Sequence, residues 1–279
     1  WLNLYRASGI SDAGLAHLAH RSSLRQLYLE GTPITDAGLV HVAGLSHLQE
    51  LHLGDTRISD AGLLQLAELT GLRELYLGDT RISDAGLVHL ARLRHLQALF
   101  LYHTRVTAAG LAQLEGLQLK KLSVPQHAHT DLGLKHYLAA LEAPAILDLK
   151  EWATTDAGLA HLEGLTSLRR LSLVGTQVTD AGLAHLQQLS GLEELYLPRQ
   201  ITDAGLVHLR GLTNLRVLHV PREITDAGVA HLAGLTGLQE LRLASLISDA
   251  GLVHLAGMTD LRRLDLTATK ITNSGLGPL

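Results

Sequence analysis

Residues 48–63 read LQELHLGDTRISDAGL, and residues 72–87 return almost unchanged as LRELYLGDTRISDAGL. The shared pattern L-x-x-L-x-L-x-x-T-x-I-[ST]-D-A-G-L recurs along the whole chain. Full units begin at residues 24, 48, 72, 96, 119, 144, 168, 192, 215 and 238, and partial units cover 1–23 and 261–279. Self-similarity at such a period is the signature of a repeat protein, in which each unit is one small structural element.

Each unit changes its apolar period halfway along. In the unit from residue 24, Leu27 and Leu29 alternate with the polar neighbours of a half-buried strand, which leaves Tyr28 on the outer face. From Ile34 onward the spacing is helical, and Thr35 is suited to cap the helix that begins there. We expect Asp36 to face the positive end of that helix, and the small Ala37 and Gly38 to let neighbouring helices pack closely.

A single unit cannot bury both its strand face and its helix face, so the units must stack. We therefore expect an α/β, right-handed, horseshoe-shaped solenoid that forms one domain over residues 1–279. Its twelve strands would make one parallel sheet on the concave face, with the helices on the convex face. A threonine at a fixed offset after the strand is expected to bond backbone groups between repeats, at Thr32, Thr56, Thr80, Thr104 and Thr176.

The repeat pattern resembles that of the leucine-rich-repeat family. Its I-[ST]-D-A-G-L half is similar to the cysteine-containing subtype found in substrate-binding arms of F-box proteins and in many bacterial repeat proteins. The chain differs from that subtype because it has no cysteine, and because threonine stands where most leucine-rich repeats have asparagine or cysteine. It contains no F-box, so a ubiquitin-ligase role is not implied. The resemblance implies a scaffold for recognising proteins.

Composition and charge argue against several classes of function. Hydrophobic residues make up 46% of the chain and aromatic residues only 3%, so leucine and alanine must fill the core, unlike in most enzymes of this size. The net charge is −4, and neither half is basic, which argues against nucleic-acid binding. The absence of cysteine excludes disulfides, thiolate metal sites and a cysteine nucleophile.

The sequence shows no membrane span and no signal peptide. The compartment is therefore left open, with the cytoplasm slightly favoured, and the oligomeric state cannot be assigned. Trp1 begins inside a strand-like pattern, and Leu279 follows directly on the start of an expected helix. We interpret the chain as a piece of a longer protein.

One column of outward-facing strand positions is rich in rings, in a chain otherwise poor in aromatics. Large amphipathic side chains on a rigid concave surface are typical anchors of protein interfaces. Alternatively, rings on neighbouring strands stabilise one another. The candidate partner-binding residues are Tyr28, His52, Tyr76 and Phe100, with Tyr102 and His103 at the end of the run, Glu50 and Glu74 beside it, and Tyr196 and His219 farther along.

Charged residues at the edge of this column have a structural interpretation. Asp55 and Asp79 precede Arg57 and Arg81, and we expect Asp–Arg pairs to form a surface ladder between repeats, although the acids could also contact a basic partner.

A histidine recurs in the helices, as at His41, and helical geometry places it on the solvent face opposite the buried stripe. We expect no metal there; a response to pH is the alternative.

The middle of the chain departs from the repeat. Residues 124–130 replace the usual G-T-x-I, an extra residue enters the following helix, and Trp152 stands where threonine is expected. A local site could form there from His103, His127, His129 and Asp148. We favour a packing irregularity, because the units from residues 192 and 215 also drop a residue and irregularity is thus tolerated.

No catalytic motif is present: the chain lacks G-x-x-x-x-G-K-[ST], G-x-S-x-G and H-E-x-x-H. We expect no enzyme, no cofactor and no metal. The leading hypothesis is a non-catalytic module that binds a protein or peptide on its concave face. The alternatives are a ligand-sensing arm of a larger signalling or immune-like protein, a metal or enzymatic site around His127 and His129, and an architectural spacer without a specific partner.

Overall fold

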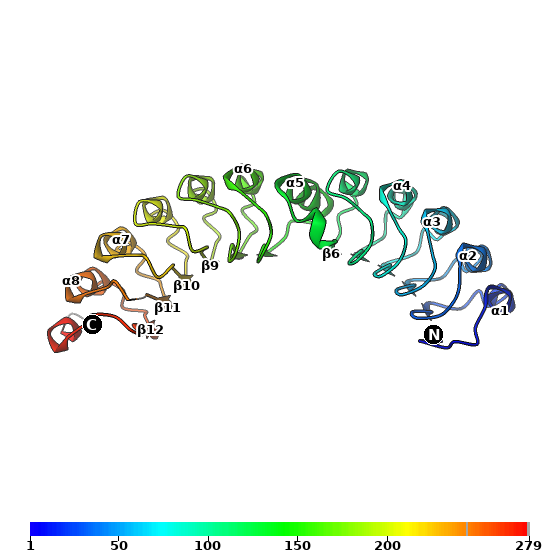
Figure 1. Cartoon of the computed structure of the whole chain (residues 1–279), viewed down its shortest axis with the longest axis horizontal. Helices are drawn as coiled ribbons and strands as arrows, with labels where there is room; N and C mark the ends of the chain where they lie inside the picture. Colours follow the sequence, from blue (N-terminus) through cyan, green and yellow to red (C-terminus); the bar gives the residue numbers. More distant parts are fainter. Residues whose placement is uncertain (244, 278–279) are drawn as a thin grey trace. The chain divides into compact units, whose positions relative to one another are not determined.

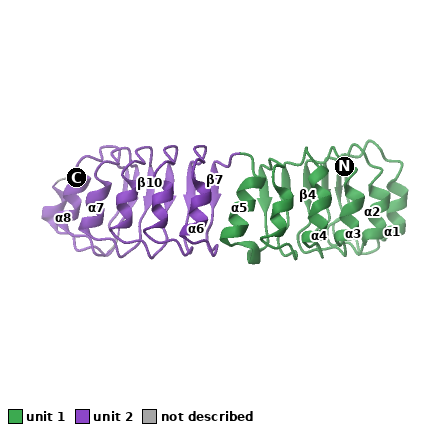
Figure 2. Ribbon diagram, turned by 90° about the horizontal axis from the view of Figure 1, so that it is seen from above, with its two compact units in different colours: residues 1–142 green, residues 143–279 purple. Residues whose placement is uncertain are grey.

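Each repeat folds as a strand of two or three residues, a turn and a short helix, as the internal change of period predicts. The computed structural model describes residues 1–243 and 245–277. It divides into two compact units, unit 1 covering residues 1–142 and unit 2 covering 143–279 (Figure 2). Each unit is described by itself below. The expectation of a single domain stays a prediction.

The strands of each unit form one parallel sheet in which every strand lies beside its predecessor. Leu51 pairs with Leu75, so the inward leucines of successive repeats stack directly on one another. Unit 1 contains β1 (Leu2–Asn3), β2 (Gln26–Tyr28), β3 (Glu50–His52), β4 (Glu74–Tyr76), β5 (Ala98–Phe100) and β6 (Lys121–Ser123). Unit 2 contains β7 (Ile146–Asp148), β8 (Arg170–Ser172), β9 (Glu194–Tyr196), β10 (Val217–His219), β11 (Glu240–Arg242) and β12 (Arg263–Asp265).

The expectation of one continuous sheet is wrong, because the described strands form two sheets of six. The break falls between the repeats that begin at residues 119 and 144, where the spacing is longest. Here Leu141 forms an isolated bridge with Leu119, ahead of β6. Pro144 opens the next repeat and has no N–H to donate to a neighbouring strand.

The helices lie on the side of each unit opposite its strands (Figure 1). They are short, and several consist of, or continue as, a 3-10 turn. The α-helices are α1 (Asp12–Leu15), α2 (Asp36–Val42), α3 (Asp60–Leu66), α4 (Asp84–Leu87), α5 (Asp131–Ala140), α6 (Asp156–Leu159), α7 (Asp226–Leu232) and α8 (Asp249–Leu252). The 3-10 helices are η1 (Ala16–Leu18), η2 (Val88–Arg92), η3 (Gly110–Leu114), η4 (Gln126–Ala128), η5 (Ala160–Leu162), η6 (Gly182–Leu186), η7 (Gly205–Leu209), η8 (Val253–Leu255) and η9 (Asn273–Leu276). No helix in the described part of the chain is long and apolar enough to cross a membrane.

The helix starts hold neighbouring repeats together. Thr35 caps α2 by accepting a hydrogen bond from the Ala37 N–H, as expected. Asp36 has a further role, because its carboxylate accepts the backbone N–H of Ser59 at 2.7 Å and the Ser59 hydroxyl at 2.5 Å, one repeat later. We call this pair of bonds an aspartate link. Further links join Asp12 to Thr35, Asp60 to Ser83, Asp84 to Thr107, Asp156 to Thr179, Asp180 to Thr202, Asp203 to Thr225, Asp226 to Ser248 and Asp249 to Thr272.

The recurrent glycine follows from the aspartate link. A β-carbon at Gly62 would collide with the Asp36 Oδ1 atom of the preceding repeat. Gly62 is buried, whereas Ala61 beside it is exposed, so the glycine alone accounts for the close approach of the helices. Ala108 stands where the repeat requires the aspartate, so its side chain cannot form the link to the following repeat.

The hydroxyl groups of the threonines after the strands bond within their own repeat and not between repeats, contrary to expectation. Thr56 donates its hydroxyl to the carbonyl of Leu53 at 2.6 Å, within its own repeat, and thereby closes the turn. The same bond forms at Thr32, Thr80, Thr104 and Thr176. Trp152 replaces this threonine in the repeat from residue 144, where Thr154 occupies the buried isoleucine position. The Thr154 hydroxyl is fully buried and has no hydrogen-bond partner among the described residues.

The helix histidines are less exposed than expected. His17 and His161 are exposed, but His41 and most of the others are half-buried. In most repeats the residue before the histidine is exposed instead, as at Val40 with 55% of its surface accessible. Four of these histidines contact a side chain of the preceding repeat, as the 2.5 Å distance between His185 Nδ1 and Glu163 Oε1 shows; the other three are His136, His208 and His231.

Candidate functional site

The four rings predicted to share a column form one stack on unit 1. Tyr28, His52, Tyr76 and Phe100 project from β2, β3, β4 and β5, which pair side by side. Successive ring centroids lie 4.3, 3.8 and 4.3 Å apart, at interplanar angles of 35°, 14° and 10°. The inner rings cover one another's faces and present their edges outward. We call these four residues the ring stack.

Carboxylates hold the ring stack from the neighbouring column. Glu50 accepts hydrogen bonds from the Tyr28 hydroxyl at 2.9 Å and from Gln26 Nε2 at 2.8 Å, and its Oε1 lies 2.8 Å from His52 Nε2. Tyr76 donates its hydroxyl to Glu74 at 2.9 Å. These bonds fix the positions of the hydroxyl groups as well as of the rings.

The titration behaviour of these groups reflects the same bonds. Burial alone would raise the pKa of Glu50, but the bonds from His52, Tyr28 and Gln26 outweigh it and lower the pKa. Burial, followed by the bond to Glu50, raises the pKa of the Tyr28 phenol. Burial and the bond to Glu74 likewise raise the pKa of Tyr76. The charged form of Glu50 and the neutral phenols of Tyr28 and Tyr76 are thus favoured.

Tyr102 and His103 do not extend the stack. The Tyr102 ring packs over Gly78, where a β-carbon would collide with it, and burial raises the pKa of the Tyr102 phenol. His103 is exposed and meets the Tyr102 ring edge-on at 5.6 Å. Its Nδ1 lies 2.9 Å from Asp79 Oδ1. These two residues lie in the turn after β5, beside the column.

A hollow of about 460 Å³ adjoins the carboxylates of unit 1. It is lined by Trp1, Ser23, Arg25, Gln26, Gln49, Glu50, Arg73 and Glu74. Sequence reasoning missed Trp1, Arg25 and Arg73 as site residues. Arg25 and Arg73 occupy the position just before the strand in their repeats, which a column-by-column comparison of the units could have found.

The expected Asp–Arg ladder is wrong. Within the described residues no ion pair joins Asp55 or Asp79 to Arg57 or Arg81, and Asp79 pairs with His103 instead. The backbone explains this result, because Asp55 and Asp79 adopt positive φ angles of 50° and 59° in the turns. Their side chains are therefore directed by the turn, not by the strand.

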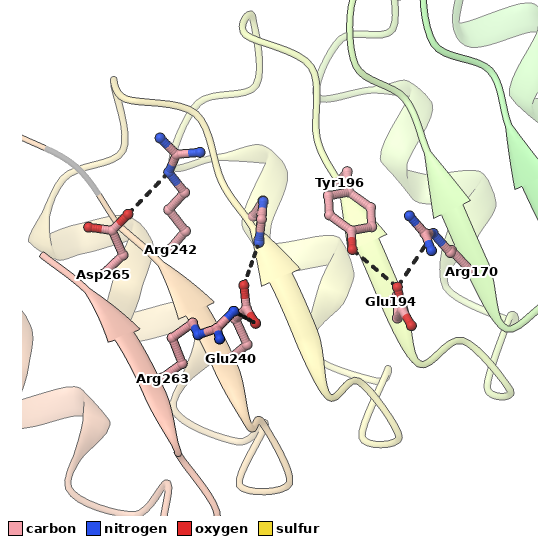
Figure 3. A network of polar contacts seen from close by, with 8 residues as sticks. Arg170, Glu194, Tyr196, Glu240, Arg242, Arg263 and Asp265 are labelled. Carbon is pink, nitrogen blue, oxygen red and sulfur yellow. Dashed lines mark hydrogen bonds and ion pairs between the residues drawn. The ribbon is translucent and has the colours of Figure 1, made fainter. Parts of the chain in front are cut away.

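On unit 2, Tyr196 and His219 belong to a network of charges. Their rings meet edge-on, with centroids 4.7 Å apart, and not as a stack. Figure 3 shows the Tyr196 hydroxyl and the Arg170 Nε atom both directed at Glu194, at 3.1 and 3.4 Å. The Arg170 guanidinium also lies 5.3 Å from the centre of the Tyr196 ring.

The same network continues across β10, β11 and β12. Glu240 lies between an imidazole and a guanidinium, 3.1 Å from His219 Nε2 and 3.0 Å from Arg263 Nη1. Arg242 pairs with Asp265 at 3.4 Å (Figure 3). The strand face of unit 2 is thus dominated by ion pairs, in contrast to the ring stack of unit 1.

The histidines of the irregular middle are separately engaged. His127 Nε2 lies 2.7 Å from the carbonyl of Val106, and burial lowers the pKa of His129. Asp148 accepts the backbone N–H of Lys150 at 3.0 Å. In the described part of the chain, no group of three or more histidine, aspartate or glutamate side chains is arranged to hold a metal ion.

Comparisons with known proteins agree with this architecture. Residues 44–67, 69–91 and 164–186 match the family model described as Leucine Rich repeat. A crystal structure of an internalin (inlF) from Listeria monocytogenes is similar with a TM-score of 0.64 and 24% identity, covering 95% of this chain and 80% of that chain. That of internalin C2 (inlC2) from the same organism has a TM-score of 0.32 and 24% identity, covering 87% of this chain and 80% of that one. No curated protein matches the sequence.

The first of these likenesses shows the fold, which is a leucine-rich-repeat solenoid with parallel strands. The resemblance noted in the sequence is thereby confirmed at the level of leucine-rich repeats. Membership of the cysteine-containing subtype stays a prediction.

Proposed function

We propose that this chain is a non-catalytic recognition module that binds a protein or peptide on the strand face of unit 1. The ring stack carries this proposal. Leucine-rich repeats and the solenoid fold support a protein-interaction module, because stacked repeats create extended binding surfaces. A site on one architecture must still be argued from its own residues.

The ring stack is suited to binding because it is held in place before a partner arrives. Stacking fixes the ring planes, and Glu50 and Glu74 fix the hydroxyls of Tyr28 and Tyr76. An anchor that is already ordered loses little side-chain entropy on binding. Aromatic residues are only 3% of the chain, so four adjacent rings on one face are a marked concentration.

The surroundings of the stack indicate the polarity of the partner. Glu50 and Glu74 border it on one side, and the hollow beyond them also contains Arg25 and Arg73. We propose a partner that offers an apolar or aromatic side chain to the ring edges, flanked by charges of both signs. Tyr102 and His103 lie outside the stack on unit 1 and would add contacts at its periphery, whereas Tyr196 and His219 lie on unit 2 and are proposed only as contacts on that unit's own strand face.

The competing interpretation is that the rings serve only stability. Stacked rings contribute about 0.5–1.5 kcal/mol per pair beyond their burial, so both roles predict a less stable protein when the rings are removed. Only the binding role predicts that a partner is lost from a variant that is still folded.

The test is a pull-down from a lysate of the source organism, analysed by mass spectrometry. Wild type is compared with a variant carrying Tyr28→Ala, His52→Ala, Tyr76→Ala and Phe100→Ala. A control variant carries Val40→Ala, Leu64→Ala and Val88→Ala, which shorten exposed side chains on the helix side. Circular dichroism first establishes that all three are folded.

We expect one protein to be enriched by wild type and by the control, and lost from the ring variant. Recovery of the same proteins by all three would mean that the rings are structural. The role of a ligand-sensing arm in a larger signalling protein stays a prediction, which the reading frame around this segment would test.

A further inference from the structure

Three consecutive repeats of unit 2 are shortened at the same place. The repeats from residues 192, 215 and 238 are 23 residues long, and in the first two the segment after the strand reads P-R-x-I in place of the longer x-x-T-x-[IV] of most other repeats. In all three repeats, one residue is missing from the turn that follows the strand. The full-length turn returns in the partial repeat from residue 261.

The shortened turns change the edge of the unit 2 sheet. In the preceding repeat, Gly175 takes a positive φ of 76° and Thr176 donates to the Leu173 carbonyl at 2.8 Å, which closes a full turn. Pro198 and Pro221 replace this arrangement, and neither has an N–H to donate. The chain therefore follows a shorter path from the strand to the next helix.

A groove of about 620 Å³ lies along these shortened turns. It extends from Val174 in the full-length turn on one side to Thr267 and Ala268 in the full-length turn on the other. Its lining residues all belong to unit 2. We call it the turn-edge groove. Because shortened turns lie between full ones, the groove is a direct product of the repeat lengths.

The turn-edge groove combines an apolar floor with cations at its rim. Leu197, Val220 and Pro221 line it and are almost fully buried. Arg199 and Arg222 line it and are exposed. Several other arginines of unit 2 have carboxylate partners: Arg170 with Glu194, Arg216 with Glu193, Arg242 with Asp265, and Arg263 with Glu240.

Arg199 and Arg222 are different from those arginines. Neither forms an ion pair with any carboxylate in the described part of the chain. An exposed guanidinium presents a planar fork of N–H donors that matches a carboxylate. Two such groups above an apolar floor are complementary to a chain that alternates acidic and apolar side chains.

We propose that the turn-edge groove binds an acidic peptide segment, whose carboxylates pair with Arg199 and Arg222 while an apolar side chain rests on Leu197 and Val220. The groove is less suited to a polyanion such as nucleic acid. Glu223 and Asp265 also line it, and a phosphate backbone would require a track of uncompensated cations. The proposal concerns a surface separate from the ring stack of unit 1.

The test measures binding of a short fluorescein-labelled peptide of alternating leucine and glutamate by fluorescence polarisation. We expect Arg199→Ala with Arg222→Ala to raise its Kd at least about tenfold, because each lost charge-assisted bond contributes strongly to affinity. The matched control, Arg57→Ala with Arg81→Ala, removes the same charge from unit 1 and should leave the Kd within about twofold. The four-ring variant should also leave it unchanged, which separates this site from the proposed function.

A second variant tests the shape of the groove with both arginines present. Ser245 is exposed on its wall, so Ser245→Trp would place a ring in the space and is expected to weaken binding by a similar factor. Three results would overturn the proposal: no binding to wild type, equal binding of a peptide with glutamine in place of glutamate, or equal Kd values for wild type and the double arginine variant. Tighter binding of oligodeoxythymidylate, abolished by the same arginine variant, would also overturn it and assign the groove to a polyanion.

Discussion

Replacing Gly86 by alanine provides a sharp test of the aspartate link. A β-carbon at this position would lie 2.5 Å from Asp60 Oδ1 and 3.0 Å from Leu63 Cδ1. Alanine is favoured over glycine within helices by about 1 kcal/mol, so propensity alone predicts stabilisation. We expect the collision to reverse the sign and to destabilise the protein by about 1–3 kcal/mol, as overpacking does.

The cost should depend on the aspartate. Asp60 accepts the Ser83 N–H at 2.7 Å and the Ser83 hydroxyl at 2.6 Å, so Asp60→Ala alone should cost about 2–4 kcal/mol, from two bonds to a charged acceptor. Without the Asp60 carboxylate, the nearest remaining atoms are Leu63 Cδ1 at 3.0 Å and the Cα atom of residue 60 at 3.2 Å, so the new methyl group requires only a small shift of its neighbours. Gly86→Ala should then cost less than about 1 kcal/mol in the Asp60→Ala background.

The assay is urea unfolding of the two single variants, the double variant and wild type, with amide exchange at Ser83 as a local measure. Amide hydrogen exchange is measured in addition to urea unfolding because a repeat array can unfold in parts, and a single unfolding transition would then not report on the junction at Ser83. Glu68→Ala is the control: Glu68 is exposed and 3.8 Å from Arg92, so its loss should cost less than about 0.5 kcal/mol. Additive effects of Gly86→Ala and Asp60→Ala would refute the reasoning, because they would show that the carboxylate is not what excludes the side chain.

Three further perturbations address other features. Thr154→Ile should stabilise the protein by about 1 kcal/mol in thermal unfolding, since it removes a buried unpaired hydroxyl. Thr80→Val should instead destabilise the protein by about 1–2 kcal/mol, because it leaves the Leu77 carbonyl unpaired. Equal effects of the two substitutions would contradict this contrast. The pKa of Glu50 is lower in the folded chain than in the unfolded chain, so its ionisation stabilises the fold at pH values above the unfolded pKa of about 4.3. This contribution is lost as the pH falls through the lower folded pKa. Glu50→Gln should therefore flatten the dependence of the unfolding free energy on pH below about 5, and an unchanged slope would argue against this role of Glu50. The raised pKa of Tyr76 acts in the opposite direction: the stabilisation it provides is complete below the unfolded pKa of about 10 and is lost as the pH rises toward the folded pKa. An absorbance titration should therefore show less phenolate in the folded chain than in the chain unfolded in urea. Tyr76→Phe should reduce this difference in phenolate content.

Much of the local fold could be predicted because the residues that determine the strand and the helix start of a repeat lie within that repeat. The alternation around Leu27 and the cap at Thr35 depend on neighbouring residues only, and both are found in the structure. The role of Asp36 could not be deduced in the same way, because its partner Ser59 lies one repeat away and a local interpretation as a helix-dipole contact was already sufficient. The helix histidines were misjudged for a similar reason, since helical geometry alone ignores the helix packed alongside.

The candidate site was predictable in position but less so in contacts. The column at Tyr28 and His52 follows directly from strand alternation and repeat register. The hydrogen bonds of Glu50 required side-chain conformations that a pattern does not specify. The failure of the Asp–Arg ladder has a backbone cause, because the positive φ at Asp79 could not be seen in the repeat. The turn-edge groove was overlooked because a missing residue was interpreted only as tolerated irregularity.

The aspartate link also makes the repeats interchangeable parts. A repeat linked on both sides, such as that of Asp36 or Asp60, contributes an acceptor to the repeat after it and presents a donor to the repeat before it. Such a repeat can be duplicated or deleted while the remaining junctions keep the same aspartate links. Growth and loss of length therefore need no compensating change elsewhere. Ala108 is an exception, because the junction that follows it must be held by other contacts. The repeat from residue 119 is consequently tied to its place in the order, and lineages of this chain should vary in length on either side of it more readily than across it.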